Sequence, residues 1–339
     1  MRLVPLGSTG LMVSEVAFGG IPIIRLSTQE ATAVLHRAFE RGINFYDTAN
    51  AYRDSESKIG AAFEGMREDI IVATKTMKRD GAGAVEQLEN SLRALRTDYI
   101  DLYQLHQIAQ QKDWDAVMAP GGAMEAVVKA KEQGKVRHIG VSSHNLAMAL
   151  KLVKSGLFTT IQFPFNFIET AAADELIPTA TAAGVGFIAM KPFAGGMIDN
   201  AEVAFKYLRQ FSSAIPDPGF DSIESVEQIT RFYEGENKVT EEDLAVMDRY
   251  RQELGTQFCR RCEYCLPCPQ GVLITPAMAY RVVAKRMSAQ VAAEFSRMPM
   301  ETVANCVNCG VCINRCPYEL PIPDLLQRNY ELYREHCTK

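Results

Sequence analysis

The stretch that decides the fold is residues 70–105, IIVATKTMKRDGAGAVEQLENSLRALRTDYIDLYQL. An apolar run opens it at residues 70–74, and a second apolar run closes it at residues 100–105. Between them, residues 84–95 carry apolar side chains at the spacing of an amphipathic helix. Two buried strands joined by one helix predict a parallel βαβ unit.

The same alternation of strand and helix continues on both sides of this unit. Helical patterns occupy residues 28–41, 123–133 and 201–211. Further strands are predicted at residues 16–19, 44–47, 136–141, 160–163 and 186–190, with a weaker one, interrupted by proline, at 214–216. Seven clear β-then-α units and a faint eighth favour a closed (β/α)8 TIM barrel over an open doubly wound sheet. No GxGxxG follows the first strand, which argues against a Rossmann domain.

The barrel is predicted to fill residues 1–253 and a second domain residues 254–339. The first fifteen residues, with glycines between apolar runs, predict a hairpin that caps the lower end of the barrel. Thr240 and Asp243 give capping-box chemistry to a helix that runs to about residue 254 and marks the boundary. Residues 276–297 are apolar on one side and predicted to be helical, so we expect an α-helical second domain.

Four chemically distinct side chains stand at or just after predicted strand ends. Asp47 and Tyr52 follow the second strand, Lys75 the third, and His106 the fourth. In a parallel barrel these ends share one face, so a carboxylate, a phenol, a lysine and an imidazole converge. A phenol with a pKa near ~10 needs an adjacent cation to donate its proton readily at neutral pH. The alternative is a structural Lys75–Asp47 ion pair beside a half-buried His106, but four such groups together favour chemistry.

These strand ends, DTAxxY, ATK and LH, resemble the aldo/keto reductase family, in the family's order, over residues 1 to about 253. The resemblance implies that Tyr52 is the general acid that protonates a carbonyl oxygen. Lys75, paired with Asp47, would lower the pKa of Tyr52, and His106 would orient the carbonyl. A substrate that is a small-molecule carbonyl or alcohol follows from this resemblance.

The same resemblance implies a nicotinamide cofactor, NAD(P)H. Ser142, Ser143 and Gln162 would hold its carboxamide. Met190 would lie against the ring, and Lys191 would begin a loop that approaches the pyrophosphate. Each residue has a structural alternative: Met190 suits a core, and Ser142 suits the cap of a helix that begins near residue 145.

Residues 217–225, DPGFDSIES, depart from the family pattern. Family members that prefer NADPH supply lysine and arginine here to bind the 2′-phosphate, whereas this stretch has no base and three acids. Repulsion of a phosphate makes strong NADPH preference doubtful. NADH, a weakly held nicotinamide, or no nicotinamide all stay open.

Eight of the nine cysteines fall into two runs in the second domain. Their repeated CxxC spacing and Cys-Pro endings are typical of bacterial two-cluster ferredoxins and predict two [4Fe-4S] clusters. Zinc is the alternative, but four-thiolate zinc sites would leave the Cys-Pro endings unexplained. The cysteines are Cys259, Cys262, Cys265, Cys268, Cys306, Cys309, Cys312 and Cys316.

In ferredoxins of this spacing the fourth cysteine of each run binds the other cluster. That crossing predicts Cys316 with the first three cysteines of the first run, and Cys268 with the first three of the second. The first run has two residues, in place of three, before its fourth cysteine, which makes the crossing less certain than the number of clusters. The whole chain resembles a subgroup of aldo/keto reductases with a C-terminal two-cluster ferredoxin-like domain.

Composition limits the partners. No apolar run reaches the ~18 residues of a membrane span, and the N-terminal residues lack a signal-peptide layout, so we expect a cytoplasmic protein without membrane contact. Residues 255–339 hold 10 lysines and arginines against 7 acids, a net charge of +3, while residues 1–254 carry −8. This excess can offset the charge of thiolate-bound clusters or attract an acidic electron-carrier protein. It is too small to indicate nucleic-acid binding.

Two functions from different classes follow. The first is a reductase that moves hydride between a nicotinamide and a carbonyl or alcohol. The second is an iron-sulfur enzyme that passes single electrons from the clusters to a substrate in the barrel pocket, without nicotinamide. Hydride carries two electrons and a [4Fe-4S] cluster transfers one at a time, so under the first function the clusters would be structural.

Overall fold

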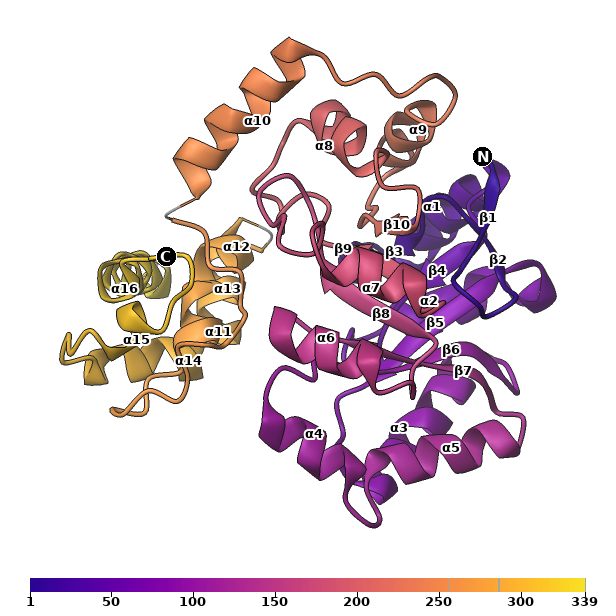
Figure 1. The fold of residues 1–339 in the computed structure, drawn as a ribbon, viewed down its shortest axis with the longest axis horizontal. Helices are drawn as coiled ribbons and strands as arrows, with labels where there is room; N and C mark the ends of the chain where they lie inside the picture. Colours follow the sequence, from indigo (N-terminus) through magenta and orange to yellow (C-terminus); the bar gives the residue numbers. More distant parts are fainter. Residues whose placement is uncertain (256, 286, 339) are drawn as a thin grey trace. The chain divides into compact units, whose positions relative to one another are not determined.

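The computed structural model describes residues 1–255, 257–285 and 287–338. The chain divides into two compact units. The first comprises Met1–Pro192 and Asn200–Val239, and the second comprises Phe193–Asp199 and Thr240–Lys339. Figure 1 follows the chain through both units, which are treated one at a time below.

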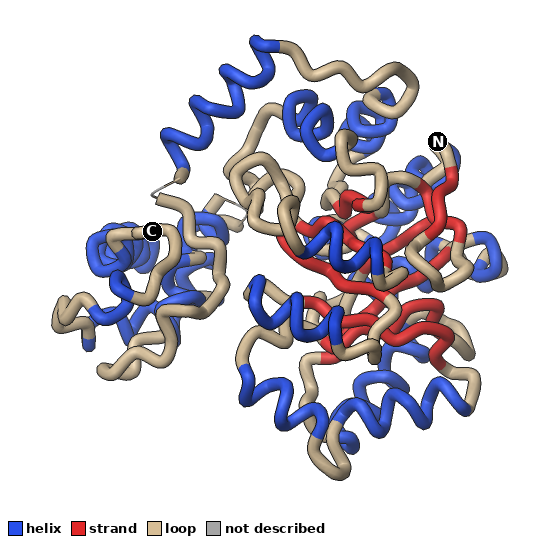
Figure 2. Tube along the Cα trace, viewed as in Figure 1, coloured by secondary structure: helices blue, strands red, loops and turns tan. Residues whose placement is uncertain are grey.

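The first unit is a barrel of eight parallel strands, shown in red in Figure 2. Each strand pairs with its neighbour in chain order. The seam between the last strand and the first is bridged at Gly19 and Gly219, with Ala17 N donating to Pro216 O at 2.8 Å. The strands are β3 (Phe18–Gly19), β4 (Phe45–Asp47), β5 (Ile71–Thr76), β6 (Ile100–Leu105), β7 (Val136–Ser142), β8 (Thr160–Pro164), β9 (Gly186–Met190) and β10 (Ala214–Asp217). The predicted barrel is confirmed, and the faint eighth strand is present as β10.

Helices follow the strands and surround them (Figures 1 and 2). The predicted helices at 28–41, 84–95, 123–133 and 201–211 correspond to α1, α3, α5 and α8. Helix α3 starts earlier than predicted because the Asp80 side chain accepts from Gly83 N at 2.7 Å and caps it. The helices of this unit are α1 (Thr28–Glu40), α2 (Ser55–Ala62), α3 (Gly81–Ala94), α4 (Gln111–Met118), α5 (Ala123–Glu132), α6 (Leu146–Lys154), α7 (Leu176–Ala182), α8 (Ala201–Leu208) and α9 (Ile223–Arg231).

The predicted N-terminal hairpin is present as antiparallel strands β1 (Leu3–Pro5) and β2 (Met12–Ser14). Leu6 and Val13 are fully buried in one apolar cluster with barrel residues such as Phe45 and Leu102. Ser8 N donates to Gly184 O just before β9, so the hairpin covers the amino-terminal ends of the strands. The carboxyl ends are thereby left for chemistry.

The second unit is helical around its own apolar core. Thr240 caps α10 through a capping box with Asp243, as predicted. The core includes Ile274, Tyr280, Ala292, Met300 and Leu326. The α-helices of this unit are α10 (Glu241–Leu254), α11 (Ile274–Met278), α12 (Tyr280–Ala284), α13 (Ala289–Phe295), α14 (Arg297–Glu301), α15 (Val311–Asn314) and α16 (Ile322–Cys337).

One detail differs from the sequence predictions. Residues 276–297 form consecutive short helices, because new helices begin after Ser288 and Ser296; residue 286 lies outside the described residues. The compact division places α10 with the second unit, whereas the predicted boundary at 253/254 placed it with the barrel. That boundary stays a prediction. Among the helices of the described ranges, none has the length and apolarity to cross a membrane.

Candidate functional site

The four predicted catalytic residues come together at the carboxyl end of the barrel. Asp47 is the last residue of β4, Lys75 lies near the end of β5, and His106 directly follows β6. Tyr52 stands in the loop between β4 and α2, where its N–H donates to Ala49 O at 2.9 Å in a tight turn. The short loop therefore returns the phenol over the strand ends.

Lys75 and Asp47 form a buried ion pair. Lys75 Nζ donates to Asp47 Oδ2 at 2.5 Å and to Thr48 O at 2.7 Å, and the Lys75 side chain is 1 % exposed. Burial acts to lower the pKa of Lys75, but the charge and hydrogen bond of Asp47, helped by Tyr52 and Asp217 when these are ionised, hold the pKa above its usual value. Lys75 is thus a cation at neutral pH.

Tyr52 and His106 face this cation. Lys75 Nζ lies 5.2 Å from the centroid of the Tyr52 ring, and the Tyr52 and His106 rings meet edge to face with centroids 5.9 Å apart. Burial, together with Lys75, Arg79 and Lys191, lowers the pKa of His106 to about 3. The imidazole is neutral at neutral pH, and its Nδ1 is buried without a hydrogen-bond partner in the described ranges. A half-exposed phenol beside a neutral imidazole can stabilise a developing oxyanion.

A fixed turn after β6 holds His106. Gln107 adopts the left-handed backbone conformation, with a φ of +56°, and its N–H donates to Ser142 Oγ at 2.8 Å. Arg79 donates from Nη1 to His106 O and from Nη2 to Gln107 O, each at 2.9 Å. Sequence reasoning missed Arg79, because nothing in the segment after the third strand indicates which carbonyls its side chain reaches.

The predicted carboxamide-binding serines both have protein partners. Ser142 is buried, and its Oγ accepts from Gln107 N. Ser143 Oγ donates to Asn145 O at 3.3 Å and accepts from Asn145 N at 3.2 Å. The helix cap considered for Ser142 belongs to Asn145, whose side chain accepts from Met148 N at 2.9 Å.

Both the nitrogen and the oxygen of the Gln162 side-chain amide have hydrogen-bond partners in the barrel. Its Nε2 donates to Asp47 Oδ2 at 3.3 Å and to Asp217 Oδ2 at 3.0 Å, while its Oε1 accepts from Gln104 Nε2 at 3.4 Å. The structure therefore places Gln162 inside the network of the Lys75–Asp47 pair. Sequence reasoning assigned it to the nicotinamide alone.

Met190 and Lys191 lie at the end of β9. Both are half-buried. Lys191 has a φ of +59°, and its carbonyl accepts from Asn166 Nδ2 at 3.0 Å. This bond fixes the backbone where the chain leaves the strand.

The three acids of residues 217–225 have different surroundings. Asp217 is buried, and burial followed by the charge of Asp47 raises its pKa well above the usual value. Asp221 pairs with Arg25 at 2.6 Å, and Glu224 lies in the first turn of α9. Because Asp217 is buried and Arg25 pairs with Asp221, this segment presents less negative charge to solvent than the sequence implied. Arg25 comes from a distant segment, so the sequence could not show this pairing. The prediction about NADPH stays a prediction.

Glu56 is a further buried acid that sequence reasoning missed. It is 3 % exposed and accepts from Thr74 Oγ1 at 2.6 Å, one residue before Lys75. Burial raises the pKa of Glu56, opposed by hydrogen bonds and by the charge of Lys75. The only signal in the sequence was its place on the helix that follows Tyr52.

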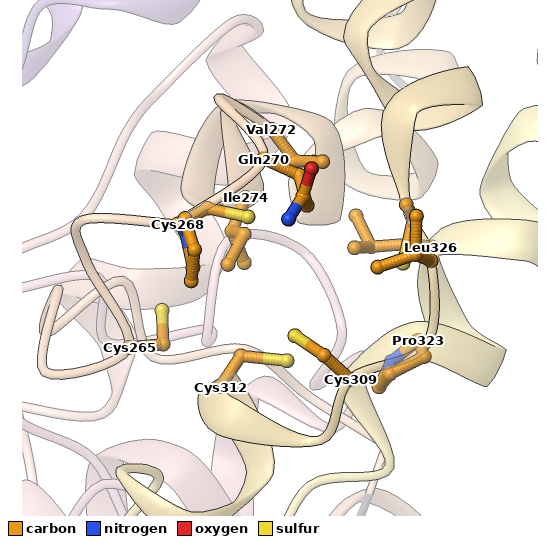
Figure 3. A pocket seen from close by; sticks show the side chains of 12 residues that line it. Cys265, Cys268, Gln270, Val272, Ile274, Cys309, Cys312, Pro323 and Leu326 are labelled. Atoms are coloured by element: carbon orange, nitrogen blue, oxygen red, sulfur yellow. The ribbon is translucent and has the colours of Figure 1, made fainter.

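In the second unit, cysteines of both runs line one cavity that is partly open to solvent. Figure 3 shows the sulfurs of Cys268, Cys309 and Cys312 turned toward the same space. Apolar residues such as Val272, Ile274 and Leu326 also line this cavity. The cysteines that line this cavity are Cys265, Cys268, Cys306, Cys309 and Cys312.

Two of the other thiols, Cys259 and Cys316, lie near Cys262. Burial raises the pKa of Cys262 to about 11, and the negative charges that Cys259 and Cys316 carry as thiolates add to this effect. Burial, with Cys259 and Cys262 nearby, raises the pKa of Cys265 to about 12. Cys316 thus lies near Cys262 of the first run, while Cys265 and Cys268 both line the cavity with cysteines of the second run. The crossed ligation stays a prediction. Iron would displace a proton from each of these buried thiols on binding.

Comparisons with known proteins agree with both units. A model described as the aldo/keto reductase family matches residues 15–245, and a model described as a 4Fe-4S dicluster domain matches residues 258–321. The second match favours iron-sulfur clusters over zinc.

Two curated relatives illustrate the similarity. The uncharacterized oxidoreductase YqkF of Bacillus subtilis is 31% identical over 273 residues, which span 76% of this chain and 84% of the relative. L-galactose dehydrogenase of Arabidopsis thaliana is 30% identical over 217 residues, which span 58% of this chain and 67% of the relative. Among solved structures, aldo-keto reductase AKR11C1 from Bacillus halodurans in its holo form aligns with a TM-score of 0.62 and 26% identity, over 74% of this chain and 96% of that one.

Proposed function

Because this chain belongs to the aldo/keto reductase family and carries a 4Fe-4S dicluster domain, we propose that it moves a hydride between a nicotinamide and a small carbonyl or alcohol at the barrel mouth. The observation that carries the proposal is the buried Lys75–Asp47 pair, with Lys75 Nζ 5.2 Å from the Tyr52 ring centroid. A phenol that acts as general acid at neutral pH needs its ionised form stabilised by a fixed cation.

Tyr52 is the general acid in the direction of reduction. Its hydroxyl gives a proton to the carbonyl oxygen as negative charge develops there, and the resulting phenolate faces the Lys75 ammonium. In the direction of oxidation the same phenolate takes the proton from the alcohol. Asp47 keeps Lys75 in place and charged.

His106 orients the carbonyl oxygen as a neutral hydrogen-bond donor. Burial lowers its pKa to about 3, so it does not compete with Tyr52 as a proton donor at neutral pH. The turn held by Arg79 and Ser142 fixes the direction of the ring. Pre-positioned donors of this kind contribute to the rate without reorganising during the reaction.

Nicotinamide supplies the hydride when it is bound. Ser142, Met190 and Lys191 fit this cofactor best: Ser142 Oγ accepts one hydrogen bond and keeps its own proton, and the other two are half-exposed at the mouth. Ser143 and Gln162 would have to give up hydrogen bonds within the protein to hold the carboxamide. Ser142 is therefore the residue that contributes most to binding the carboxamide.

The two clusters belong to the second domain, assigned to residues 254–339. Cys259, Cys262, Cys265 and Cys316 would hold one cluster; Cys306, Cys309, Cys312 and Cys268 would hold the other. The shared cavity and the buried thiols support this assignment. Hydride transfer needs no one-electron carrier, so the clusters stabilise the fold of their domain.

One observation favours the second function, single-electron transfer without nicotinamide. Gln162, expected to hold the carboxamide, is bonded at both ends within the barrel. In that case Tyr52 would still donate the proton, and an acidic electron carrier would be the partner of the positive second domain. The two functions differ in whether nicotinamide is consumed.

The test is carbonyl reduction by a Tyr52→Phe variant under anaerobic conditions, with benzaldehyde as the probe and NADH or NADPH as the reductant. We expect turnover to fall about 10²- to 10⁴-fold, the range of general-acid catalysis, with iron content unchanged. Tyr99→Phe is the matched control, because Tyr99 precedes β6 at the opposite end of the barrel. Full activity of the Tyr52→Phe variant would show that Tyr52 is not the general acid.

A further inference from the structure

Two carboxyl groups meet beneath the proposed reaction site. Asp217 ends β10 and Asp47 ends β4, yet their side chains face each other beside the Gln162 amide. Gln162 Nε2 joins them, at 3.0 Å from Asp217 Oδ2 and 3.3 Å from Asp47 Oδ2. Two carboxyl groups can hydrogen-bond each other only when one of them carries a proton.

The charges around Asp217 do not balance if both acids are ionised. Asp47 faces it from β4 and Lys75 from β5, while the flanking strands β9 and β3 contribute Met190 and Gly19, which carry no charge. Lys75 already donates to Asp47 at 2.5 Å. A second carboxylate would leave one net negative charge in a buried site, and such a charge is strongly unfavourable without its own partner.

The other oxygen of Asp217 has no compensating donor. Asp217 Oδ1 is buried, and no hydrogen-bond partner for it exists among residues 1–255, 257–285 and 287–338. A Cβ placed on Gly19 would lie 2.9 Å from this oxygen, so the backbone of β3 packs directly against it. An ionised carboxylate there would lose most of its hydration without replacement.

We propose that Asp217 carries a proton at neutral pH and shares it with Asp47, so that Lys75 is paired with a single negative charge. Asp217 is then a positioning residue: it acts on Tyr52 through Asp47 and Lys75, and its neutral form keeps the Lys75 ammonium free to stabilise the Tyr52 phenolate. This role rests on the proposed function. The proton on Asp217 does not, because it follows from the barrel alone.

Infrared spectroscopy of the full-length holoprotein, carrying aspartate labelled with ¹³C at the side-chain carboxyl, tests the proton. We expect a carbonyl band of a protonated aspartic acid at pH 7 that disappears in Asp217→Asn. Labelled aspartate separates this band from buried Glu56. Asp221→Asn, an exposed acid four residues away, is the matched control and should keep the band. Absence of the band in the wild type, or its survival in Asp217→Asn, would overturn the proposal.

The Asp47→Asn variant tests the sharing. Without Asp47, Asp217 is left as the aspartate that faces Lys75, so it should ionise and the protonated-aspartate band should vanish at pH 7. A band of full intensity in Asp47→Asn would show that the proton on Asp217 is independent of Asp47, which contradicts the shared proton.

Unfolding gives an independent reading, because Trp114 on α4 is the single tryptophan and reports on the barrel. The pKa of Asp217 is raised in the folded state, so above the unfolded value of about 4 the unfolded chain releases the proton first. As the pH increases above about 4, the unfolding equilibrium constant of the wild type should therefore rise relative to that of Asp217→Asn, by up to tenfold per pH unit. Asp221→Asn should not remove this rise. Equal pH dependence in wild type and Asp217→Asn would contradict the proposal, even if nicotinamide proves to be the cofactor.

Discussion

His106 shows how burial selects one role for a residue that has several. Its ring lies edge to face with Tyr52, and burial and three nearby cations lower its pKa to about 3. A histidine at its usual pKa of about 6.5 would be partly charged at neutral pH and could give its proton to the substrate. Neutral His106 leaves that step to Tyr52.

Replacing His106 with asparagine should change how barrel stability depends on pH. The folded pKa lies below the unfolded pKa, so as pH falls from about 6.5 towards about 3 the unfolded chain binds the extra proton. The wild type should lose up to about 1.4 kcal/mol per pH unit relative to His106→Asn in this window. Denaturant unfolding followed by Trp114 fluorescence measures this difference. Parallel stability curves for the two proteins would show that His106 titrates normally.

At the scale of single elements, the turn after β6 connects catalysis to folding. Ser142, the last residue of β7, accepts from Gln107 N, and Ile108 N donates to Ser142 O at 2.8 Å. One residue of a neighbouring strand thus fixes the loop that carries His106. The same hydroxyl is the proposed contact of the nicotinamide carboxamide.

Ser142→Ala should therefore affect both stability and catalysis. It removes the Ser142 Oγ acceptor of the part-buried Gln107 N–H, a loss of about 0.5–1.5 kcal/mol in the free energy of unfolding. It should also raise the KM for nicotinamide and lower kcat with the benzaldehyde probe, because His106 is no longer fixed. Ser142→Thr retains the hydroxyl and should restore much of both. If Ser142→Ala loses stability alone, the turn does not govern the position of His106.

At the scale of the whole molecule, sequence patterns predicted the barrel and the cluster domain because both rest on local spacing. Apolar runs identified all eight strands, including β10 despite Pro216. Spacing could not show that Asp217 turns inward to Asp47, or that Arg25 reaches Asp221, since both contacts join distant segments. The short helices between the cysteine runs were merged in the prediction, because an apolar face continues across their breaks.

The crossed ligation of the clusters can be tested with single cysteine variants. Cys268→Ala should remove the cluster that Cys306→Ala removes, and Cys316→Ala should remove the cluster that Cys259→Ala removes, because the predicted crossing assigns the fourth thiol of each run to the cluster of the other run. Iron and sulfide analysis with electron paramagnetic resonance of the reduced proteins would compare the remaining clusters. Matching spectra for Cys268→Ala and Cys259→Ala would instead show that each run binds its own cluster.

The central claim is that the barrel uses nicotinamide for hydride transfer. The most direct measurement is an anaerobic titration of the reduced holoprotein with NADH and, separately, NADPH, following nicotinamide fluorescence and the visible absorbance of the clusters together. We predict saturable binding of at least one nicotinamide, weaker in Ser142→Ala, with no change in cluster absorbance. Failure of both nicotinamides to bind would contradict the claim and favour electron transfer from the clusters.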